Sequence, residues 1–304
     1  MKILIIGAGV LGSNLAHSLK KGNDITILAR NQTYKNLKNN GLVIHHKLGK
    51  KTIDNFNIID KLEKNDIYDV IFVTVRFSSL DEIVPIIEDN QSKNIVFVGN
   101  NMSVEKQMNI KNKNVLFAFF MVAGKKYDGY IDSICLNKIK IGRTDGKDMS
   151  NEFIKSIFKE TKIKVMIENK MNDYLKAHAC AVLPLVFASY KVNGNLKLLK
   201  KDKEYSLLIM DAIIEGYDVL KKLGYEILPK GEYENCVNKK NFCAWIYRWM
   251  FSNFIGKLCI SDHAMSARDE FLLLDGEFEK LKKKAKMETK VYDKLKVDFL
   301  NAKD

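Results

Sequence analysis

The hydrophobic pattern of the chain changes near residue 168. Before it, short apolar runs alternate with polar or glycine-rich turns, which is typical of strands covered on both faces in a parallel sheet. Strands are predicted at residues 3–6, 24–29, 69–75, 95–98, 115–122, 133–142 and 163–167, with shorter ones within 41–59. After it, helical periodicity predicts helices at residues 172–190, 203–223, 241–258, 263–274 and 279–299. The predicted fold class is α/β, with a doubly wound parallel sheet over residues 1–167 and an all-helical domain over residues 168–304.

The first apolar run leads into a glycine-rich turn with the spacing G-x-G-x-x-G between a strand and a helix. Gly7 permits a tight turn, Gly9 lets a pyrophosphate approach the backbone, and Gly12 lets the helix lie close to the sheet. The motif alone is weak evidence, because glycines also gather in structural turns, but apolar residues at helical spacing follow it. We therefore predict a Rossmann-type, dinucleotide-binding domain. Its cofactor contacts would include Gly7, Ala8, Gly9, Val10, Leu11 and Gly12.

Polar residues follow three of the predicted strands. Arg30 ends the second strand, where an acid would bind the ribose of NADH and an arginine suits the 2′-phosphate of NADPH. With no acid at this point NADPH is favoured, and the alternative is an arginine that caps a surface strand. Arg76 and Asn100 follow two later strands, at the sheet edge where ligands bind in open α/β folds. Both are candidates for cofactor or substrate contact, although asparagine is also a common turn residue.

The composition indicates a globular protein. Of the 304 residues, 46% are hydrophobic, but no run is long enough to span a bilayer and no secretory signal is present, so we expect a cytoplasmic protein without a membrane partner. Five widely spaced cysteines contain no C-x-x-C pair, so neither a disulfide framework nor a metal site is expected. The net charge of +13 raises the question of nucleic acid, but lysines alternate with acids and no nucleic-acid motif appears. A basic cleft would instead favour an anionic cofactor and a carboxylate substrate.

The helical half contains a lysine in an apolar setting. Lys176 is surrounded in sequence by apolar residues, and an ammonium there is costly to bury unless a charge or a substrate answers it. Such a lysine could protonate a carbonyl oxygen as hydride arrives at the carbon, and the alternative is an ammonium that reaches solvent. His178 points away from it on a helix and is more typical of a core or interface histidine. Arg268 could pair with a substrate carboxylate, or it could be an exposed helix arginine. The aromatic stretch 244–251 is either core or a homodimer surface.

These residues together resemble the ketopantoate reductase (2-dehydropantoate 2-reductase) family over nearly the whole chain. The resemblance rests on GAGVLGS at 7–13, Arg30, VTVR at 73–76, VGNNMS at 98–103, Ala123 and YLKAHACAVLPL at 174–185. It implies NADPH-dependent reduction of a 2-oxo acid to a 2-hydroxy acid without a metal. It also implies that Lys176 is the proton donor, that Asn100 contacts the cofactor and the reacting region, and that Ala123 belongs to the cofactor site.

The chain departs from the family pattern mainly in its second half. The family carries asparagines four and eight residues beyond the lysine, where this chain has Cys180 and Pro184, and Ser266 matches the family's serine-rich stretch only loosely. We expect cofactor use to survive better than substrate identity, with His178, Cys180, Ser266 and Arg268 as candidate substrate residues. Two other functions stay open: a catalytically silent NADP(H)-sensing regulator and an opine-type dehydrogenase that reduces an imine.

Overall fold

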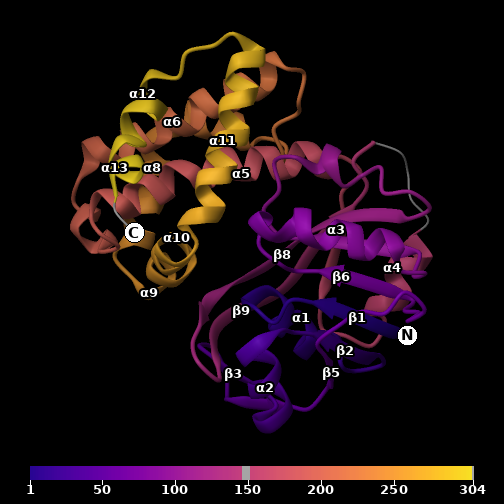
Figure 1. The fold of residues 1–304 in the computed structure, drawn as a ribbon. Helices are drawn as coiled ribbons and strands as arrows, with labels where there is room; N and C mark the ends of the chain where they lie inside the picture. The colour runs from indigo at the N-terminus through magenta and orange to yellow at the C-terminus, as the bar shows by residue number, and fades with distance from the viewer. Residues whose placement is uncertain (146–150, 303–304) are drawn as a thin grey trace. The chain divides into compact units, whose positions relative to one another are not determined.

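The computed structural model describes residues 1–145 and 151–302. It divides into two compact units, Met1–Met171 and Asn172–Asp304, which are described separately below. The boundary expected at residue 168 falls between the last strand, β10 (Lys164–Ile167), and the long helix α5 (Met171–Lys191). Figure 1 shows a sheet-containing N-terminal unit and a helical C-terminal unit, so the predicted fold class is confirmed.

The N-terminal unit is built on a parallel sheet in which the first strand is central. β1 pairs in parallel with β2 on one side and with β6 on the other, so the chain reverses its direction of winding at β1. The parallel strands, in spatial order, are β8 (Asn114–Lys126), β7 (Asn94–Val98), β6 (Val70–Val73), β1 (Lys2–Ile6), β2 (Asp24–Leu28) and β5 (Asn57–Ile59). Ligands of doubly wound folds bind at such a switch point, beyond the carboxyl ends of the strands.

The other side of the sheet is mixed. β9 (Ile131–Gly142) runs antiparallel to β8, and β3 (Leu42–His46) and β10 both pair in parallel with β9. A short edge strand, β4 (Thr52–Asp54), pairs antiparallel with β3. β8 is longer than predicted, because its ladder with β9 extends to the pair Lys126 and Ile131. As a result Ala123 lies inside a strand.

The described part of this unit contains four α-helices, and only the first was predicted. α1 (Val10–Leu19) packs on β8 and β9 and buries Leu15, Ala16 and Leu19. The other three are α2 (Asn31–Asn40), α3 (Leu80–Asp89) and α4 (Asn151–Phe158). The helical signal of α2 is weak, because this helix buries only Leu37, and Pro85 argued against a helix at α3 although Leu80, Ile83 and Ile87 lie at helical spacing. Short 3-10 turns, η1 (Phe77–Ser79) and η2 (Val104–Lys106), follow β6 and β7.

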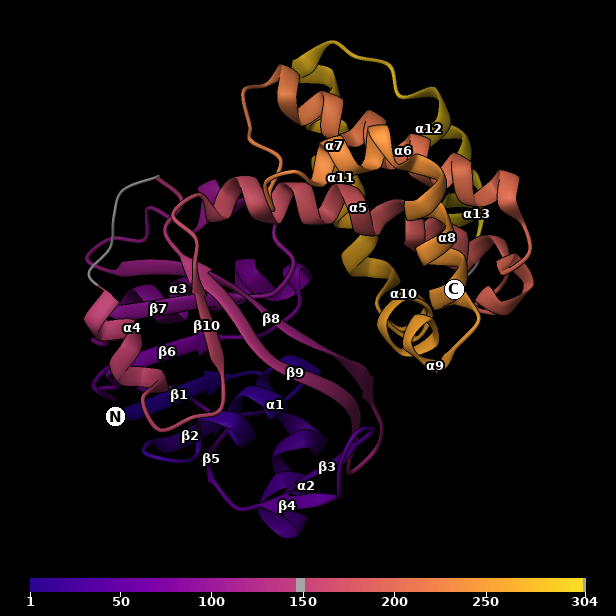
Figure 2. The same ribbon diagram turned by 180° about the vertical axis from the view of Figure 1, so that it is seen from behind.

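The C-terminal unit is helical throughout its described residues (Figure 2). Its elements after α5 are η3 (Leu196–Leu199), α6 (Lys203–Lys222), α7 (Glu232–Asn238), α8 (Lys240–Phe251), α9 (Phe254–Gly256), η4 (Lys257–Ser261), α10 (Asp262–Ser266), α11 (Arg268–Ala285), α12 (Lys290–Leu295) and α13 (Val297–Asn301). Phe187 of α5 packs against Tyr292 and Phe299, with ring centroids 5.1 and 5.4 Å apart. These fully buried rings join the first helix of the unit to the last two.

The last three predicted helices have wrong boundaries, including 263–274, which is interrupted at Ala267, and 279–299, which is divided among α11, α12 and α13. The expected helix over residues 241–258 ends at Phe251, because Asn253 caps a new turn by accepting a hydrogen bond from the Ile255 backbone. The expected break near residue 275 does not occur. α11 continues through Gly276, where an added Cβ would meet nothing within 4 Å, and ends at Ala285, after which Lys286 has a positive φ of 51°.

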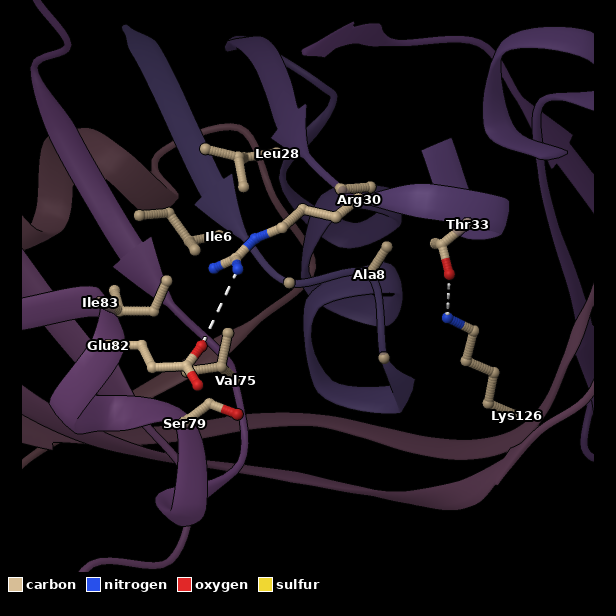
Figure 3. Close-up of a pocket in the computed structure, with 13 residues that line it drawn as sticks. Ile6, Ala8, Leu28, Arg30, Thr33, Val75, Ser79, Glu82, Ile83 and Lys126 are labelled. Carbon is tan, nitrogen blue, oxygen red and sulfur yellow. Dashed lines mark hydrogen bonds and ion pairs between the residues drawn. The ribbon is translucent and has the colours of Figure 1, made fainter. Parts of the chain in front are cut away.

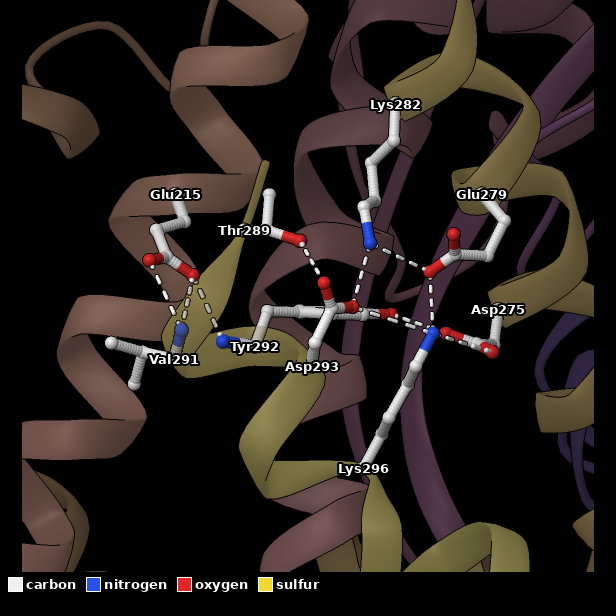
Figure 4. A network of polar contacts seen from close by, with 9 residues as sticks. All are labelled: Glu215, Asp275, Glu279, Lys282, Thr289, Val291, Tyr292, Asp293 and Lys296. Atoms are coloured by element: carbon white, nitrogen blue, oxygen red, sulfur yellow. Dashed lines mark hydrogen bonds and ion pairs between the residues drawn. The ribbon is translucent and has the colours of Figure 1, made fainter. Parts of the chain in front are cut away.

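A network of charged groups fixes the last helices (Figure 4). Glu215 of α6 accepts hydrogen bonds from the Val291 and Tyr292 backbone N–H groups at 2.9–3.1 Å, so a carboxylate lies at the positive end of α12. Tyr292 donates its hydroxyl to Asp275 at 2.8 Å, and burial raises the pKa of that carboxyl group. Lys282, Lys296, Glu279 and Asp293 complete the network.

Candidate nucleotide-binding site and a buried lysine

The glycine turn after β1 is closely packed at Gly7 and Gly12 and open at Gly9. Gly7 has a φ of +104°, and a Cβ on Gly12 would lie 1.9 Å from the Gly7 carbonyl oxygen. Thr74, at the end of β6, places its hydroxyl oxygen 2.9 Å from the carbonyl oxygens of Ile6 and Gly7. A Cβ on Gly9, in contrast, would meet nothing within 4 Å. The turn is therefore built for close approach of the helix, and it leaves space at Gly9 for a pyrophosphate.

A pocket lies beside this turn at the switch point of the sheet. It is lined by residues at the ends of β1, β2 and β6, by the first turns of α2 and α3, and by the end of β8. Four of the predicted cofactor residues line it, namely Gly7, Ala8, Gly9 and Arg30. Val10, Leu11 and Gly12 continue the turn into α1 without lining the described pocket.

Two cationic side chains reach this pocket (Figure 3). Arg30 pairs with Glu82 of α3 at 3.8 Å, and both side chains are more than half exposed, so the pair is weak. Lys126, the last residue of β8, donates a hydrogen bond to the Thr33 hydroxyl at 2.8 Å. The sequence suggested Arg30 alone. Thr33, Glu82 and Lys126 were missed because they come from two unpredicted helices and from an unpredicted extension of a strand.

The remaining cofactor candidates lie near this edge but do not line the described pocket. Arg76 is exposed and precedes η1, and its charge helps to lower the pKa of Lys126. Asn100 is half-buried and follows Gly99, which has a φ of +134°. Ala123 is half-buried in β8 opposite Ile134. The structure thus brings Arg76 close enough to interact with Lys126 electrostatically.

In the C-terminal unit, Lys176 is buried. Its side chain on α5 is 1% exposed, and its ammonium donates a hydrogen bond to the Asn172 side chain. The same ammonium lies 5.2 Å from the centre of the Tyr225 ring, a cation–π contact. Asp173 accepts a hydrogen bond from the Glu226 backbone at 3.0 Å, which holds the segment that carries Tyr225 against α5. The sequence did not point to Tyr225, because contacts between distant segments leave no local pattern.

His178 and Cys180 lie further along α5. Burial lowers the pKa of His178 to about 4, with a further contribution from the charge of His263, so this imidazole is neutral at pH 7. Its ring stacks on Tyr174 with the centroids 6.2 Å apart. Cys180 is fully buried against Gly216 of α6, and burial raises the pKa of its thiol. Neither group is a reactive ion at neutral pH.

Ser266 and Arg268 lie at the junction of α10 and α11. Ser266 is exposed and donates its hydroxyl to the His263 carbonyl oxygen at 3.2 Å. Arg268 donates to the carbonyl oxygens of Phe299 and Leu300 at 3.3 and 3.4 Å. Arg268 therefore binds the last turn of α13, where carbonyl groups lack helical partners.

The described residues were compared with the requirements for a metal site, a disulfide and a membrane-spanning helix. Over residues 1–145 and 151–302, no group of three or more His, Cys, Asp or Glu side chains is placed to hold a metal ion. All five cysteines are free thiols. In the same described residues, none of the helices combines the length and the apolar character needed to cross a bilayer.

The sheet order, the switch point and the glycine turn define the N-terminal unit as a Rossmann-type domain. Residues 3–146 match the family described as "Ketopantoate reductase PanE/ApbA". The N-terminal unit is therefore similar to the ketopantoate reductase family, and over these residues the resemblance seen in the sequence is confirmed.

One curated relative is similar over a short stretch. It is "Uncharacterized oxidoreductase YkpB" of Bacillus subtilis (strain 168), 34% identical over 85 residues. The aligned part is 28% of this chain and spans only 27% of that relative's length.

Solved structures share the fold of the whole chain. A D-mandelate dehydrogenase determined with NADH and anilino(oxo)acetate has a TM-score of 0.80 at 17% identity, covering 99% of this chain and 97% of its own. A dimeric ketopantoate reductase from Staphylococcus aureus has a TM-score of 0.73 at 13% identity, covering 99% of both chains. At these identities the likeness shows the fold.

Proposed function

We propose that this protein is an NADPH-dependent reductase that converts a small 2-oxo acid to the corresponding 2-hydroxy acid. The observation that carries the proposal is the buried ammonium of Lys176, held by Asn172 and Tyr225 in the stretch that resembles the family's proton-donor helix. An ammonium removed from water is costly unless hydrogen-bond acceptors, a partner charge or a bound group answer it. The substrate's carbonyl oxygen, which gains negative charge during reduction, is such a group.

In the proposed reaction the hydride and the proton come from different groups. Bound NADPH would supply the hydride to C2 of the oxo acid. Lys176 would donate a proton from its Nζ atom to the carbonyl oxygen, so that hydride and proton together give the hydroxyl group. Asn172 and the Tyr225 ring would orient the ammonium for this transfer. Asn100, Arg76 and Ala123 would complete the contacts with cofactor and substrate.

The cofactor proposal rests on the glycine turn and the cations beside it. The turn at Gly7 to Gly12 leaves room for a pyrophosphate, and Arg30 lines the adjoining pocket. The D-mandelate dehydrogenase structure contains NADH together with an oxo-acetate, which supports nicotinamide chemistry on a 2-oxo acid in this fold. The arginine at the end of β2 favours NADPH for this chain, because a guanidinium can pair with a 2′-phosphate.

His178, Cys180, Ser266 and Arg268 stay candidates for substrate selection. Of these, His178 is the one we favour for a direct polar contact, because it is neutral at pH 7 and can donate or accept a hydrogen bond. Cys180 is packed against Gly216, and Arg268 is engaged with α13. We expect Cys180 and Arg268 to influence substrate selection indirectly, through the packing of the C-terminal helices.

The test of the reaction is turnover of a panel of 2-oxo acids followed by NADPH absorbance. We expect oxidation with at least one acid, and Lys176→Met should lower kcat by about 100-fold or more, because general-acid catalysis contributes on that order. Methionine keeps the volume of the buried side chain. Lys191→Ala, on the same helix but exposed, should leave kcat unchanged.

Three outcomes would contradict this reaction. Full turnover by Lys176→Met would remove the proton-donor role. Tight NADPH binding with no oxidation of any acid would favour the NADP(H)-sensing regulator. Turnover that requires an added amine would favour the opine-type dehydrogenase.

The cofactor preference is tested through Arg30. Arg30→Ala should weaken NADPH binding by about 10-fold or more, which corresponds to the loss of a hydrogen-bonded charge pair, while NADH binding changes little. Titration of cofactor fluorescence measures both dissociation constants. Lys38→Ala, at the far end of α2, is the control of equal charge change. An equal effect of Arg30→Ala on both cofactors would refute the assignment.

We also propose that the protein is a homodimer through an exposed face of α8. Phe242, Trp245, Ile246 and Trp249 recur at helical spacing and are 37–56% exposed, and such a contiguous aromatic face is typical of an interface. The dimeric ketopantoate reductase from Staphylococcus aureus supports a second copy as the occupant.

Light scattering after size exclusion tests the dimer. The wild type should have about twice the chain mass of 34.9 kDa, and the double variant Trp245→Ser and Trp249→Ser should shift toward the monomer. Leu48→Ser, which removes a leucine that is 73% exposed in the N-terminal unit, should not. A monomeric wild type, or a double variant that stays dimeric, would contradict the proposal.

A further inference from the structure

The pocket beside the glycine turn contains a second cation that the sequence did not suggest. Lys126 lines it from the end of β8, while Arg30 lines it from the end of β2. The Lys126 ammonium is held at 2.8 Å by the hydroxyl of Thr33. In the view of Figure 3, the two cations lie on either side of Ala8.

The two cations differ in their partners. Arg30 has a carboxylate partner, Glu82, at 3.8 Å. Among the residues that the structure describes, no carboxylate forms an ion pair with Lys126. Lys126 is an exposed residue, but the protein atoms around its ammonium partly desolvate it and lower its pKa, the charge of Arg76 lowers the pKa further, and Asp128 offsets part of this. A positive charge in these surroundings is stabilised by an arriving anion.

The position of Thr33 indicates which anion. Arg30 is the residue that immediately precedes α2, and Thr33 is the third residue of that helix, so they are three positions apart. The backbone between them is not helical, since Arg30 is extended and Asn31 has a positive φ of 53°, but both side chains line the same pocket. The hydrogen bond from Lys126 to Thr33 therefore holds the lysine toward the turn that carries Arg30. The pyrophosphate, in contrast, is expected at the start of α1.

We propose that Lys126, positioned by Thr33, is a second specificity-determining cation that contacts the 2′-phosphate of NADPH together with Arg30. The inference rests on the proposed cofactor and extends it, since Arg30 alone would then give only part of the preference for NADPH. A 2′-phosphate carries up to two negative charges near pH 7, so two cations match it better than one. The weak, exposed pair between Arg30 and Glu82 can open when the phosphate arrives.

Cofactor titration without substrate tests this inference. Lys126→Ala should weaken NADPH binding by about 10-fold or more and leave NADH binding within about 3-fold. Thr33→Val, which keeps the shape of the side chain and removes the hydroxyl, should weaken NADPH binding less, in the same direction. Glu82→Gln should strengthen NADPH binding, because it removes the competing carboxylate from Arg30.

Lys125→Ala is the matched control. Lys125 is the neighbour of Lys126 on β8 and lies 5.5 Å from the Tyr127 ring, and adjacent strand residues point to opposite faces. It makes the same change in net charge, so it should leave both dissociation constants unchanged. Thermal unfolding of each variant checks that the fold is retained.

Two results would overturn the inference. Equal weakening of NADPH and NADH by Lys126→Ala would place the lysine on the pyrophosphate, and no weakening would remove it from the cofactor. If Arg30→Ala lowers NADPH binding while Lys126→Ala does not, this inference fails and the proposed cofactor stands. If no 2-oxo acid is reduced but the Lys126 effect is present, the proposed reaction fails and this inference stands.

Discussion

The N-terminal unit depends on one close contact, the approach of α1 to the end of β1. The Gly12 position faces the Gly7 carbonyl oxygen so closely that any side chain there would overlap the backbone, and the Thr74 hydroxyl from β6 fills the remaining space. This contact fixes where the first helix leaves the sheet. It also leaves the Gly9 side open, so the same constraint that packs the helix creates the room for a phosphate. Every other part of the candidate cofactor site is positioned around this turn.

The parts of the fold that sequence reasoning predicted are those with a strong local pattern. The buried strands β1, β2, β6 and β7 are short apolar runs, and α5 and α6 have clear helical periodicity. The polar helix α2 has no such pattern, whereas α3 carries Leu80, Ile83 and Ile87 at helical spacing but contains Pro85, and both helices were missed. These two helices supply Thr33 and Glu82, so the errors in secondary structure became omissions in the site.

The surroundings of the buried Lys176 were likewise only partly predictable from the sequence. Lys176 could be singled out because a charge in an apolar helix is visible in the sequence, but its contact with Tyr225 is formed by a segment that returns after α6. Arg268 shows the opposite case. Its charge suggested a substrate contact, and the structure gives it a structural partner in the last turn of α13. Local pattern therefore identifies residue types that can do chemistry, whereas long-range packing decides which of them are available.

The proposed reaction requires that hydride pass from NADPH to C2 of a 2-oxo acid. The most direct measurement uses NADPH labelled with deuterium at the transferring position, with each acid of a panel, and analyses the product by mass spectrometry and NMR. We predict a 2-hydroxy acid that carries deuterium at C2. Oxidation of the cofactor without a labelled 2-hydroxy acid, or no oxidation with any acid, would contradict it.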